Sequence, residues 1–257
     1  MDWKTYEKEV YDFLPDTAKK IIQETPEKAV FCRDGIIDED VFGKASLNGK
    51  PFRPLFILKE VHDKDGCNGC GELLSGCKNH GKNEAFGMHW IDFSKCKNGY
   101  KAQEGTTAKL LEFEEIIEEV LKVDLGNIDR RNILSRVAII NLKKIGGGGT
   151  AESYKSHRTL SYSCHAQKFE NRIKKQIEEI KPSIIVCGGT YGEVGKILGA
   201  NKKIDARYES CKVFSSLLLN EDVEIFDMYH PKQTRLKDEV IKEQFRMVCE
   251  DAKKRLK

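Results

Sequence analysis

The sequence contains no long apolar run. No stretch approaches the ~20 consecutive apolar residues that a membrane-spanning helix requires. The N-terminal stretch MDWKTYEKEVYDFL is charged throughout and lacks the apolar segment of a signal peptide. We therefore expect a cytoplasmic protein without a membrane partner.

Proline is scarce and the net charge is small. The chain has 6 prolines and a formal net charge of +3, with 39% hydrophobic and 33% charged residues. This balance excludes a disordered or fibrous chain and favours a globular one. The small net charge permits a nucleic-acid partner without requiring one, because a phosphate-binding face depends on locally clustered lysines.

The chain also lacks internal repeats. Its 257 residues exceed the common domain size, but one α/β domain with an insertion accommodates them. We expect a single domain over residues 1–257, with an N-terminal helical extension over 1–50 and a cysteine-rich insertion over 64–104. The insertion is longer than the ~12 to 15 residues of an ordinary loop, which favours a functional, disordered or metal-bound segment.

Short apolar runs alternate with amphipathic patterns along the chain. The runs predict strands at residues 54–60, 137–142, 183–188 and 223–229, and the patterns predict helices at 106–122, 166–180, 191–198 and 237–256. Strands that alternate with helices favour a parallel sheet covered on both faces. The predicted fold is a three-layer α/β/α sandwich with a central, mostly parallel sheet of about four strands.

Polar residues gather where the predicted strands end. They occupy residues 60–63, 141–149, 188–191 and 230–232. In open parallel sheets, ligands bind beyond the carboxyl ends of the strands. These four segments are therefore the candidate site.

The same segments carry a family resemblance. PLFILKEVHD resembles the first motif of the uracil-DNA glycosylase superfamily, "ilfiGEaPG", and MYHPKQTR resembles its second motif, "HPS". GTTAKLLEFEEIIEEVL, IINLKK and IEEIKPSIIVCGGTYGEVGKILG are similar to "GraGklLdelLeeil", "itNvvK" and "ikPkiivalGatAaraLLG" of the iron-sulfur branch. The match covers roughly residues 54–250 apart from the insertion, and its five pieces follow in the right order. The resemblance implies a glycosylase-like fold and excision of a base from DNA.

The resemblance assigns catalytic roles to three residues. His230 would donate to the base oxygen, Asn141 would pair with the base edge, and Glu60 would orient water or contact the substrate. Each residue type also has a structural interpretation: a helix-capping or lysine-paired carboxylate, a turn-forming asparagine, or a histidine that merely ends a strand.

Other positions depart from the family pattern. Val61 stands where some branches have a water-activating aspartate, His62 and Asp63 replace Pro-Gly, and Lys232 replaces the serine of the second motif. We treat His62 and Asp63 as substrate-binding candidates. Trp90 and Tyr100 are candidates for stacking on an extruded base, with packing of the insertion as the alternative.

Backbone amides and basic side chains near the strand ends are candidate DNA contacts. These residues are Lys143, Lys144, Gly147, Gly189, Thr190, Lys232 and Arg235. Glycine lets backbone N–H groups approach an anion, and a helix that begins after a glycine turn can face a phosphate. Tight turns and ordinary solvated lysines are the alternatives.

Four of the nine cysteines lie in the insertion. Cys67 and Cys70 form a CxxC flanked by glycines, and Cys77 and Cys96 follow. Four thiolates suffice for zinc or an iron-sulfur cluster, and free thiols are the alternative. The iron-sulfur glycosylases place their cysteines elsewhere, so the resemblance does not extend to this set.

The leading hypothesis is a monomeric DNA glycosylase-like protein that acts on uracil or hypoxanthine and requires no cofactor for catalysis. Val61 and Lys232 motivate an alternative, a non-catalytic nucleic-acid-binding module on the same fold. A nucleotide- or metal-dependent enzyme of another doubly wound family is a third hypothesis.

Overall fold

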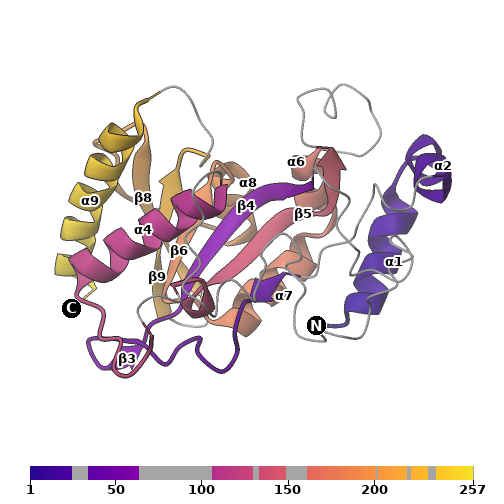
Figure 1. Cartoon of the computed structure of the whole chain (residues 1–257). Helices are drawn as coiled ribbons and strands as arrows, with labels where there is room; N and C mark the ends of the chain where they lie inside the picture. The colour runs from indigo at the N-terminus through magenta and orange to yellow at the C-terminus, as the bar shows by residue number, and fades with distance from the viewer. Residues whose placement is uncertain are drawn as a thin grey trace. The chain divides into compact units, whose positions relative to one another are not determined.

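The computed structural model of the chain describes residues 1–24, 34–63, 106–129, 133–148, 161–200, 202–218, 221–230 and 236–256 (Figure 1). The helices among them are α1 (Trp3–Phe13), α2 (Asp16–Glu24), α4 (Thr106–Leu121), α6 (Tyr162–Lys168), α7 (Glu170–Ile180), α8 (Tyr191–Ile197) and α9 (Asp238–Arg255), with a 3-10 turn at Ile133–Arg136. The strands are β1 (Gly35–Ile36), β2 (Ser46–Leu47), β3 (Lys50–Pro51), β4 (Pro54–Asp63), β5 (Ala138–Gly148), β6 (Ile184–Gly188), β7 (Lys202–Asp205), β8 (Cys211–Leu218) and β9 (Glu221–Met228).

Seven strands of the described residues form one sheet in the order β1-β5-β4-β6-β9-β8-β7. Strands β4, β6 and β9 run parallel to one another, whereas β8 is antiparallel to β9 and β7 is antiparallel to β8. The predicted α/β class and mostly parallel sheet are confirmed. The prediction of about four strands is wrong, because three further strands lack a continuous apolar run: β1 has two residues, β7 has the sequence KKID, and β8 buries only part of its CKVFSSLL sequence.

The boundaries of two predicted strands are also corrected. Strand β4 extends to Asp63 and β5 extends to Gly148, beyond the predicted ends at residues 60 and 142. The glycines and lysines of β5 have no apolar pattern, but the backbone hydrogen bonds that extend a strand do not depend on the type of side chain. The predicted helix at 166–180 is two helices, because the backbone leaves the helical conformation at Phe169.

The chain forms two compact units. Unit one consists of Met1–Gly35, Lys59–Asp92 and Asn141–Gln176, and unit two consists of Ile36–Leu58, Phe93–Ile140 and Ile177–Lys257. Strands β4 and β5 and helix α7 each pass from one unit into the other. Each unit has its own apolar contacts among the described residues.

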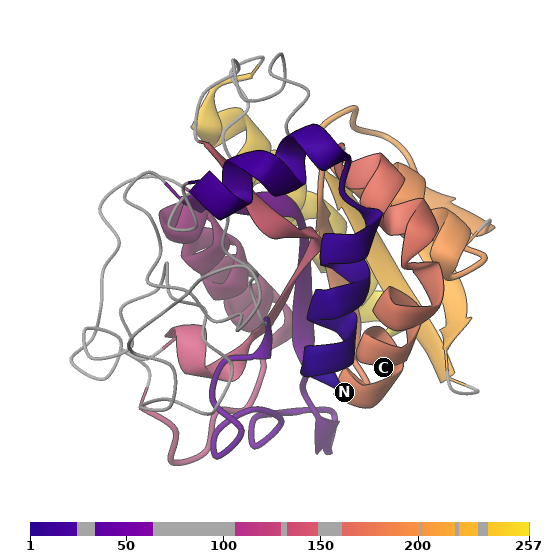
Figure 2. The same ribbon diagram turned by 90° about the vertical axis from the view of Figure 1, so that its right-hand side faces the viewer.

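In unit one, helix α1 packs along the start of α7 (Figure 2). Tyr6 is fully buried, and its ring lies 5.4 Å from that of Phe169 between their centroids. Glu9, one turn further along α1, accepts two hydrogen bonds from the guanidinium of Arg172, at 2.6 and 3.1 Å. Asp2 accepts from the backbone N–H of Thr5 and begins α1 as its N-cap.

In unit two, helices cover both faces of the sheet. Phe226 of β9 contacts Phe245 of α9, with ring centroids 5.7 Å apart. Phe214 of β8 pairs in register with Ile225, the residue before Phe226, and therefore faces the opposite side. Its ring stacks on Tyr191 of α8, with centroids 3.9 Å apart. Helix α4 lies on the α9 side, beside α9 (Figure 1).

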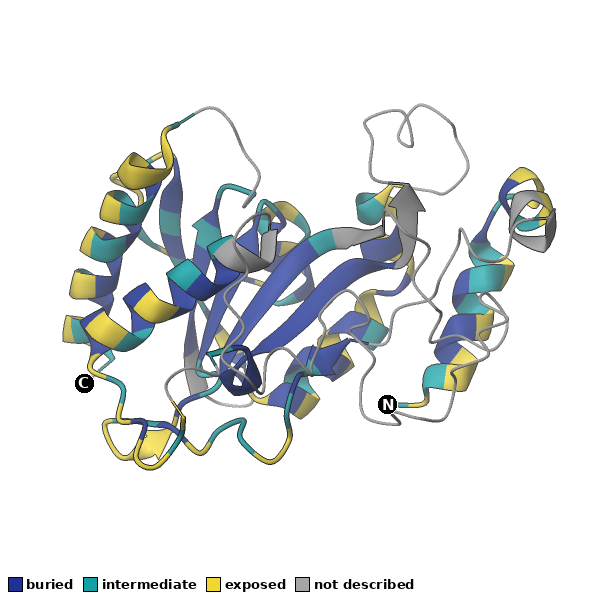
Figure 3. Ribbon diagram, viewed as in Figure 1, coloured by how far each residue is buried: buried dark blue, intermediate teal, exposed yellow. Residues whose placement is uncertain are grey.

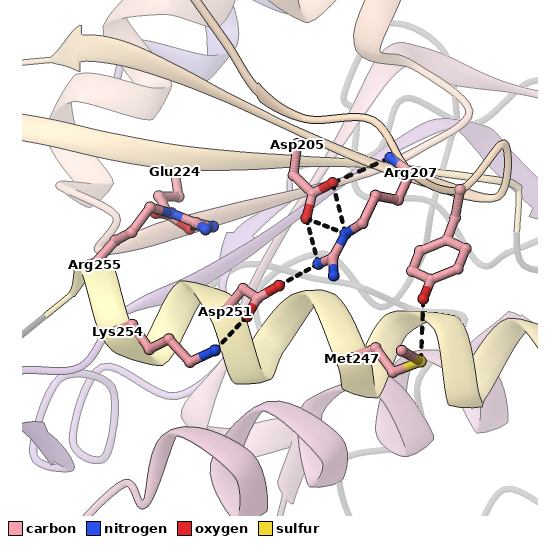
Figure 4. Close-up of polar contacts among 8 residues, drawn as sticks. Asp205, Arg207, Glu224, Met247, Asp251, Lys254 and Arg255 are labelled. Carbon is pink, nitrogen blue, oxygen red and sulfur yellow. Dashed lines mark hydrogen bonds and ion pairs between the residues drawn. The ribbon is translucent and has the colours of Figure 1, made fainter.

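Ion pairs connect the β7–β8 hairpin and β9 to the last turns of α9 (Figure 4). Arg207 binds Asp205 at 2.6 Å and also Asp251 of α9, and Arg255 of α9 binds Glu224 of β9 at 2.6 Å. Arg207 is 47% exposed, so water screens its ion pairs and they contribute little to stability. The apolar inner face of α9, dark blue in Figure 3, supplies most of the attachment.

Helix α4 carries a buried carboxyl group that lacks a hydrogen-bond partner among the described residues. Both side-chain oxygens of Glu114 are buried and unbonded. Burial raises the pKa of Glu114 well above its usual range, and the charge of Glu118 adds to this rise while Arg136 opposes it. The guanidinium of Arg136 donates to Glu118 instead, in a bidentate pair at 2.6 and 2.8 Å.

Replacing Glu114 with methionine is expected to stabilise the protein at pH 8 by about 1 to 3 kcal/mol. A carboxyl whose folded-state pKa is raised favours folding below its unfolded pKa and loses that contribution as the pH rises. The gain should therefore shrink toward pH 4. Urea unfolding at both pH values measures it, and an equal change at pH 4 and pH 8 would contradict the titration of Glu114.

No helix in the described part of the chain is both long and apolar enough to cross a membrane.

Candidate functional site

His230 follows the last residues of β9 at the carboxyl edge of the parallel strands in unit two. Strand register pairs Gly188 of β6 with Met228 of β9, so both strands end at this edge. His230 is half-buried in a small cleft. The cleft is lined by Lys109, Phe113, Tyr229, His230, Asp238, Ile241 and Lys242. Its interior has room for about one water molecule, so a larger ligand meets His230 at the mouth.

Charged side chains surround this cleft in a connected network. The ammonium of Lys109 lies 2.5 Å from Asp238 and 3.2 Å from Glu112, which also pairs with Lys242 at 3.0 Å. Burial opposes the charge of Lys109, but its hydrogen bonds to Asp238 and Glu112 outweigh this effect and raise the pKa of Lys109. The two lysines of this network are balanced by its two carboxylates, so these four side chains carry no net charge together.

The polar groups of the turn after β6 form hydrogen bonds with backbone carbonyls of neighbouring strands. Gly189 has a φ of +69°, and its N–H donates to the carbonyl of Met228 at 2.8 Å. Thr190 is 1% exposed, and its hydroxyl donates to the carbonyl of Ile57 at 2.8 Å. These bonds tie the turn to β9 and β4. The sequence predicts that Gly189 and Thr190 contact phosphate, whereas here the Gly189 N–H and the Thr190 hydroxyl donate to protein carbonyls.

Unit one contains a fully buried polar cluster around Asp34. The carboxylate is 0% exposed and receives hydrogen bonds at both oxygens. Oδ1 accepts from Lys144 Nζ at 2.5 Å and from Gln176 Nε2 at 2.9 Å. Oδ2 accepts from the backbone N–H and the side-chain Nδ2 of Asn141, at 2.5 and 3.2 Å.

Gln176 closes this cluster from helix α7. Its Nε2 also donates to the Asp34 carbonyl at 2.8 Å, and its Oε1 accepts from Lys144 Nζ at 3.1 Å. Every charged atom of the Asp34–Lys144 pair therefore faces a partner. A buried ion pair is tolerated when its remaining hydrogen-bonding capacity is satisfied in this way.

The cluster changes the interpretation of β5. Asn141, Lys143, Lys144 and Gly147 lie within the strand, not in the loop after it. Lys143 and Lys144 are 4% and 0% exposed, and Lys144 is paired with Asp34. This placement differs from the surface phosphate contacts predicted for the two lysines. The physical reason is that β5 continues beyond its apolar half, so the lysines are inside unit one.

Residues that the sequence analysis did not single out include Lys109 of the cleft, Gln176 and Asp34 of the cluster, and Asp227. The signal for Asp34 was indirect: two lysines within a buried strand require a counter-ion. Asp227, half-buried near the end of β9, faces Lys212 in register, and burial raises its pKa although Lys212 opposes the rise. A partly accessible carboxylate of this kind at a ligand-binding edge is a candidate functional group.

His165 is a further buried titratable group in unit one. It is 0% exposed, and neither ring nitrogen has a hydrogen-bond partner among the described residues. Phe13 meets its ring edge-on, with centroids 5.5 Å apart. Burial lowers the pKa of His165 to about 3, and the charge of Lys143 adds to the effect. His165 is therefore neutral at physiological pH.

Several predicted site residues lie outside the described part of the chain. The side chains of Glu60, His62 and Asp63 are among them, although their backbone belongs to β4. The others are Trp90, Tyr100, Lys232, Arg235, Cys67, Cys70, Cys77 and Cys96. Within the described residues no group of His, Cys, Asp or Glu forms a metal site. Asn141 belongs to unit one and His230 to unit two, so a shared pocket with Glu60 stays a prediction.

A polar cluster centred on Asp34 and a charged cleft at His230 are thus the two sites that the described residues build. Neither a comparison with protein-family models nor one with curated proteins finds a match for this chain.

Proposed function

We propose that this protein recognises or excises a deaminated base, uracil or hypoxanthine, in DNA. One observation carries the proposal: the four segments predicted as strands, which include the two glycosylase-like motifs, are the four adjacent strands β5-β4-β6-β9. A second observation supports it. His230, the histidine of the second motif, lies two residues after the end of β9 and lines a cleft with Lys109.

The chemistry requires stabilisation of charge on both fragments. As the glycosidic bond breaks, the sugar becomes cationic and the departing base becomes anionic. In this proposal the base leaves the helical stack and meets His230 at the cleft mouth, where the imidazole donates to the base oxygen. Asn141 pairs with the base edge, and Glu60 orients the attacking water.

The remaining assignments belong to the same proposal. DNA is the partner, the protein acts as a monomer in the cytoplasm, and no cofactor takes part in catalysis. His62 and Asp63 contact the substrate, Trp90 or Tyr100 stacks on the base, and Lys232 and Arg235 contact phosphates. The insertion cysteines bind zinc or an iron-sulfur cluster, or they are free thiols.

Purified protein is expected to release base from oligonucleotides that contain uracil or hypoxanthine, in single- or double-stranded form, detected as strand scission after alkali. His230→Ala should slow this release about 10²-fold, because one donor to the departing base is lost. Lys174→Met, an exposed change on α7, serves as the control and should retain the wild-type rate. Absence of scission on every deaminated base would exclude the enzyme.

Treatment with EDTA is expected to leave the rate of base release unchanged, because the proposed roles of Asn141, His230 and Glu60 involve no metal. Metal analysis and an absorption spectrum of the same preparation report separately on the insertion cysteines, since an iron-sulfur cluster absorbs visible light and zinc does not. If EDTA abolished base release and added zinc restored it, a metal would take part in the reaction.

Val61 favours one alternative, a non-catalytic nucleic-acid-binding module on the same fold. A valine at this position offers no group to activate water. This function predicts salt-sensitive DNA binding that survives His230→Ala, with no base released by either protein.

A further inference from the structure

Lys59 of β4 carries a half-buried ammonium group in unit one. It packs over the ring of Tyr162 at the start of α6, with Nζ 5.4 Å from the ring centroid. Among the described residues this ammonium forms no hydrogen bond and no ion pair. The ring of Tyr162 holds the ammonium in place but supplies no acceptor atom. Shielding an ammonium from water without an acceptor costs free energy, so a lysine in this position usually has one.

Tyr162 adds a second hydrogen-bond donor at the same place. Its side chain is half-buried, and its hydroxyl has no hydrogen-bond partner within the described part of the chain. A phenolic hydroxyl donates one hydrogen bond. Because Nζ of Lys59 lies over the ring that carries this hydroxyl, a tetrahedral anion can reach both groups. Two donors from different elements, each lacking an acceptor, are typical of an anion site.

A second lysine lies under the same face of α6. Lys143 belongs to β5, the strand next to β4, and is 4% exposed. Its charge lowers the pKa of His165, which follows Tyr162 by one turn of α6, so the field of Lys143 acts on this helix face. His165 is neutral at physiological pH and adds no opposing charge. An anion bound at Lys59 is therefore also attracted by Lys143.

The place of Lys59 in the fold also favours a ligand. It lies in the second half of β4, which runs parallel to β6, and ligands bind at the carboxyl ends of parallel strands. Helix α6 lies beside this end of β4 and β5 (Figure 1). In the family motif "ilfiGEaPG", glycine stands at the position of Lys59. Because glycine has no side chain, a cation here is a feature of this chain and not of the motif.

We propose that Lys59 and Tyr162 form a binding site for a phosphate group at the carboxyl end of β4. The ammonium of Lys59 supplies a point charge, and the hydroxyl of Tyr162 supplies a directed hydrogen bond. The phosphate belongs to a DNA backbone or to a free nucleotide, which present the same oxygens. The site goes beyond base recognition, because it binds phosphate whether or not a base is excised.

Binding of two probes by wild-type protein and variants tests the site. The probes are a labelled oligonucleotide with ordinary bases only, and thymidine 5′-monophosphate with thymidine as its phosphate-free control. Lys59→Met is expected to weaken phosphate binding about tenfold, and for the oligonucleotide to reduce the slope of log affinity against log salt by about one. Tyr162→Phe keeps the ring but loses the donor, and should weaken binding by a smaller factor. Lys174→Met, the same change on the exposed side of α7, should retain the wild-type affinity.

The two probes distinguish the sources of the phosphate. Weaker binding of the oligonucleotide by Lys59→Met identifies DNA, whereas weaker binding of the mononucleotide alone identifies a free nucleotide. The assignment is overturned if folded Lys59→Met binds both probes as tightly as the wild-type protein does. Failure of the wild-type protein to bind either probe would overturn it equally.

A measurement on the wild-type protein avoids dependence on variants that do not fold. At a probe concentration ten times the Kd, acetic anhydride should acetylate Lys59 about tenfold more slowly than in the free protein, because most sites are occupied. Lys174 should react at the same rate with and without probe, as followed by mass spectrometry of peptides. Unchanged acetylation of Lys59 would refute the site. Neither probe contains a deaminated base, so a protein that excises no base can still show this protection.

Discussion

Replacing Lys144 with methionine is expected to lower the free energy of unfolding by about 3 to 5 kcal/mol. The substitution leaves the Asp34 carboxylate fully buried without its ammonium partner, which lies 2.5 Å away in the native protein. The volume of the side chain changes little, so the loss is electrostatic and not a packing defect. Urea or thermal unfolding at pH 7 measures it.

Two further variants separate the charge effect from other causes. Lys174→Met makes the same chemical change on the exposed side of α7 and should alter stability by less than about 0.5 kcal/mol. Asp34→Asn/Lys144→Met removes both charges and should recover much of the lost stability, because the penalty arises from one charge left alone. Additive losses in the double variant would show that the two residues act independently.

Acidification is expected to destabilise the protein through His165. Its pKa in the folded protein is about 3, against about 6.5 when unfolded. The unfolded state therefore binds the proton first. Stability from this residue is complete above pH 6.5, falls as the pH drops toward 3, and changes no further below that. The loss across the window is on the order of 5 kcal/mol.

His165→Leu isolates this effect from the carboxylates that also titrate in acid. Leucine keeps the contacts with Phe13 and Phe169 apolar and cannot bind a proton. The difference between wild-type and variant unfolding free energies, followed from pH 7 to pH 3.5, should grow by up to about 1.4 kcal/mol per pH unit. Parallel curves would mean that the pKa of His165 does not differ between the folded and the unfolded protein.

Local patterns were sufficient to predict most elements of the sheet and its helices. Strand β6 is a continuous IIVCG run that is buried at every position, and α9 places Ile241, Phe245 and Val248 on one face. Both signals depend only on neighbours within a few residues. Strand β8 escaped prediction because its burial alternates irregularly among serines, and its place is set by pairing with β9.

The candidate sites divide in a similar way. His230 was predictable, because a polar residue directly after an apolar strand lies at the ligand-binding edge of a parallel sheet. The environment of Asn141 was not, because its partner Asp34 is 107 positions away in the chain. Lys144 looked like a surface cation for the same reason, because its counter-ion Asp34 belongs to a different segment of the chain.

Periodicity and residue type along the chain thus determined the α/β class, the parallel core strands and the polar ends of those strands. The fold alone decided that Lys144 is a buried ion, that His165 is neutral and that Asn141 lies against Asp34. The physical reason is that the cost of removing a charge or an amide from water, and the partner that offsets this cost, depend on three-dimensional surroundings contributed by distant residues.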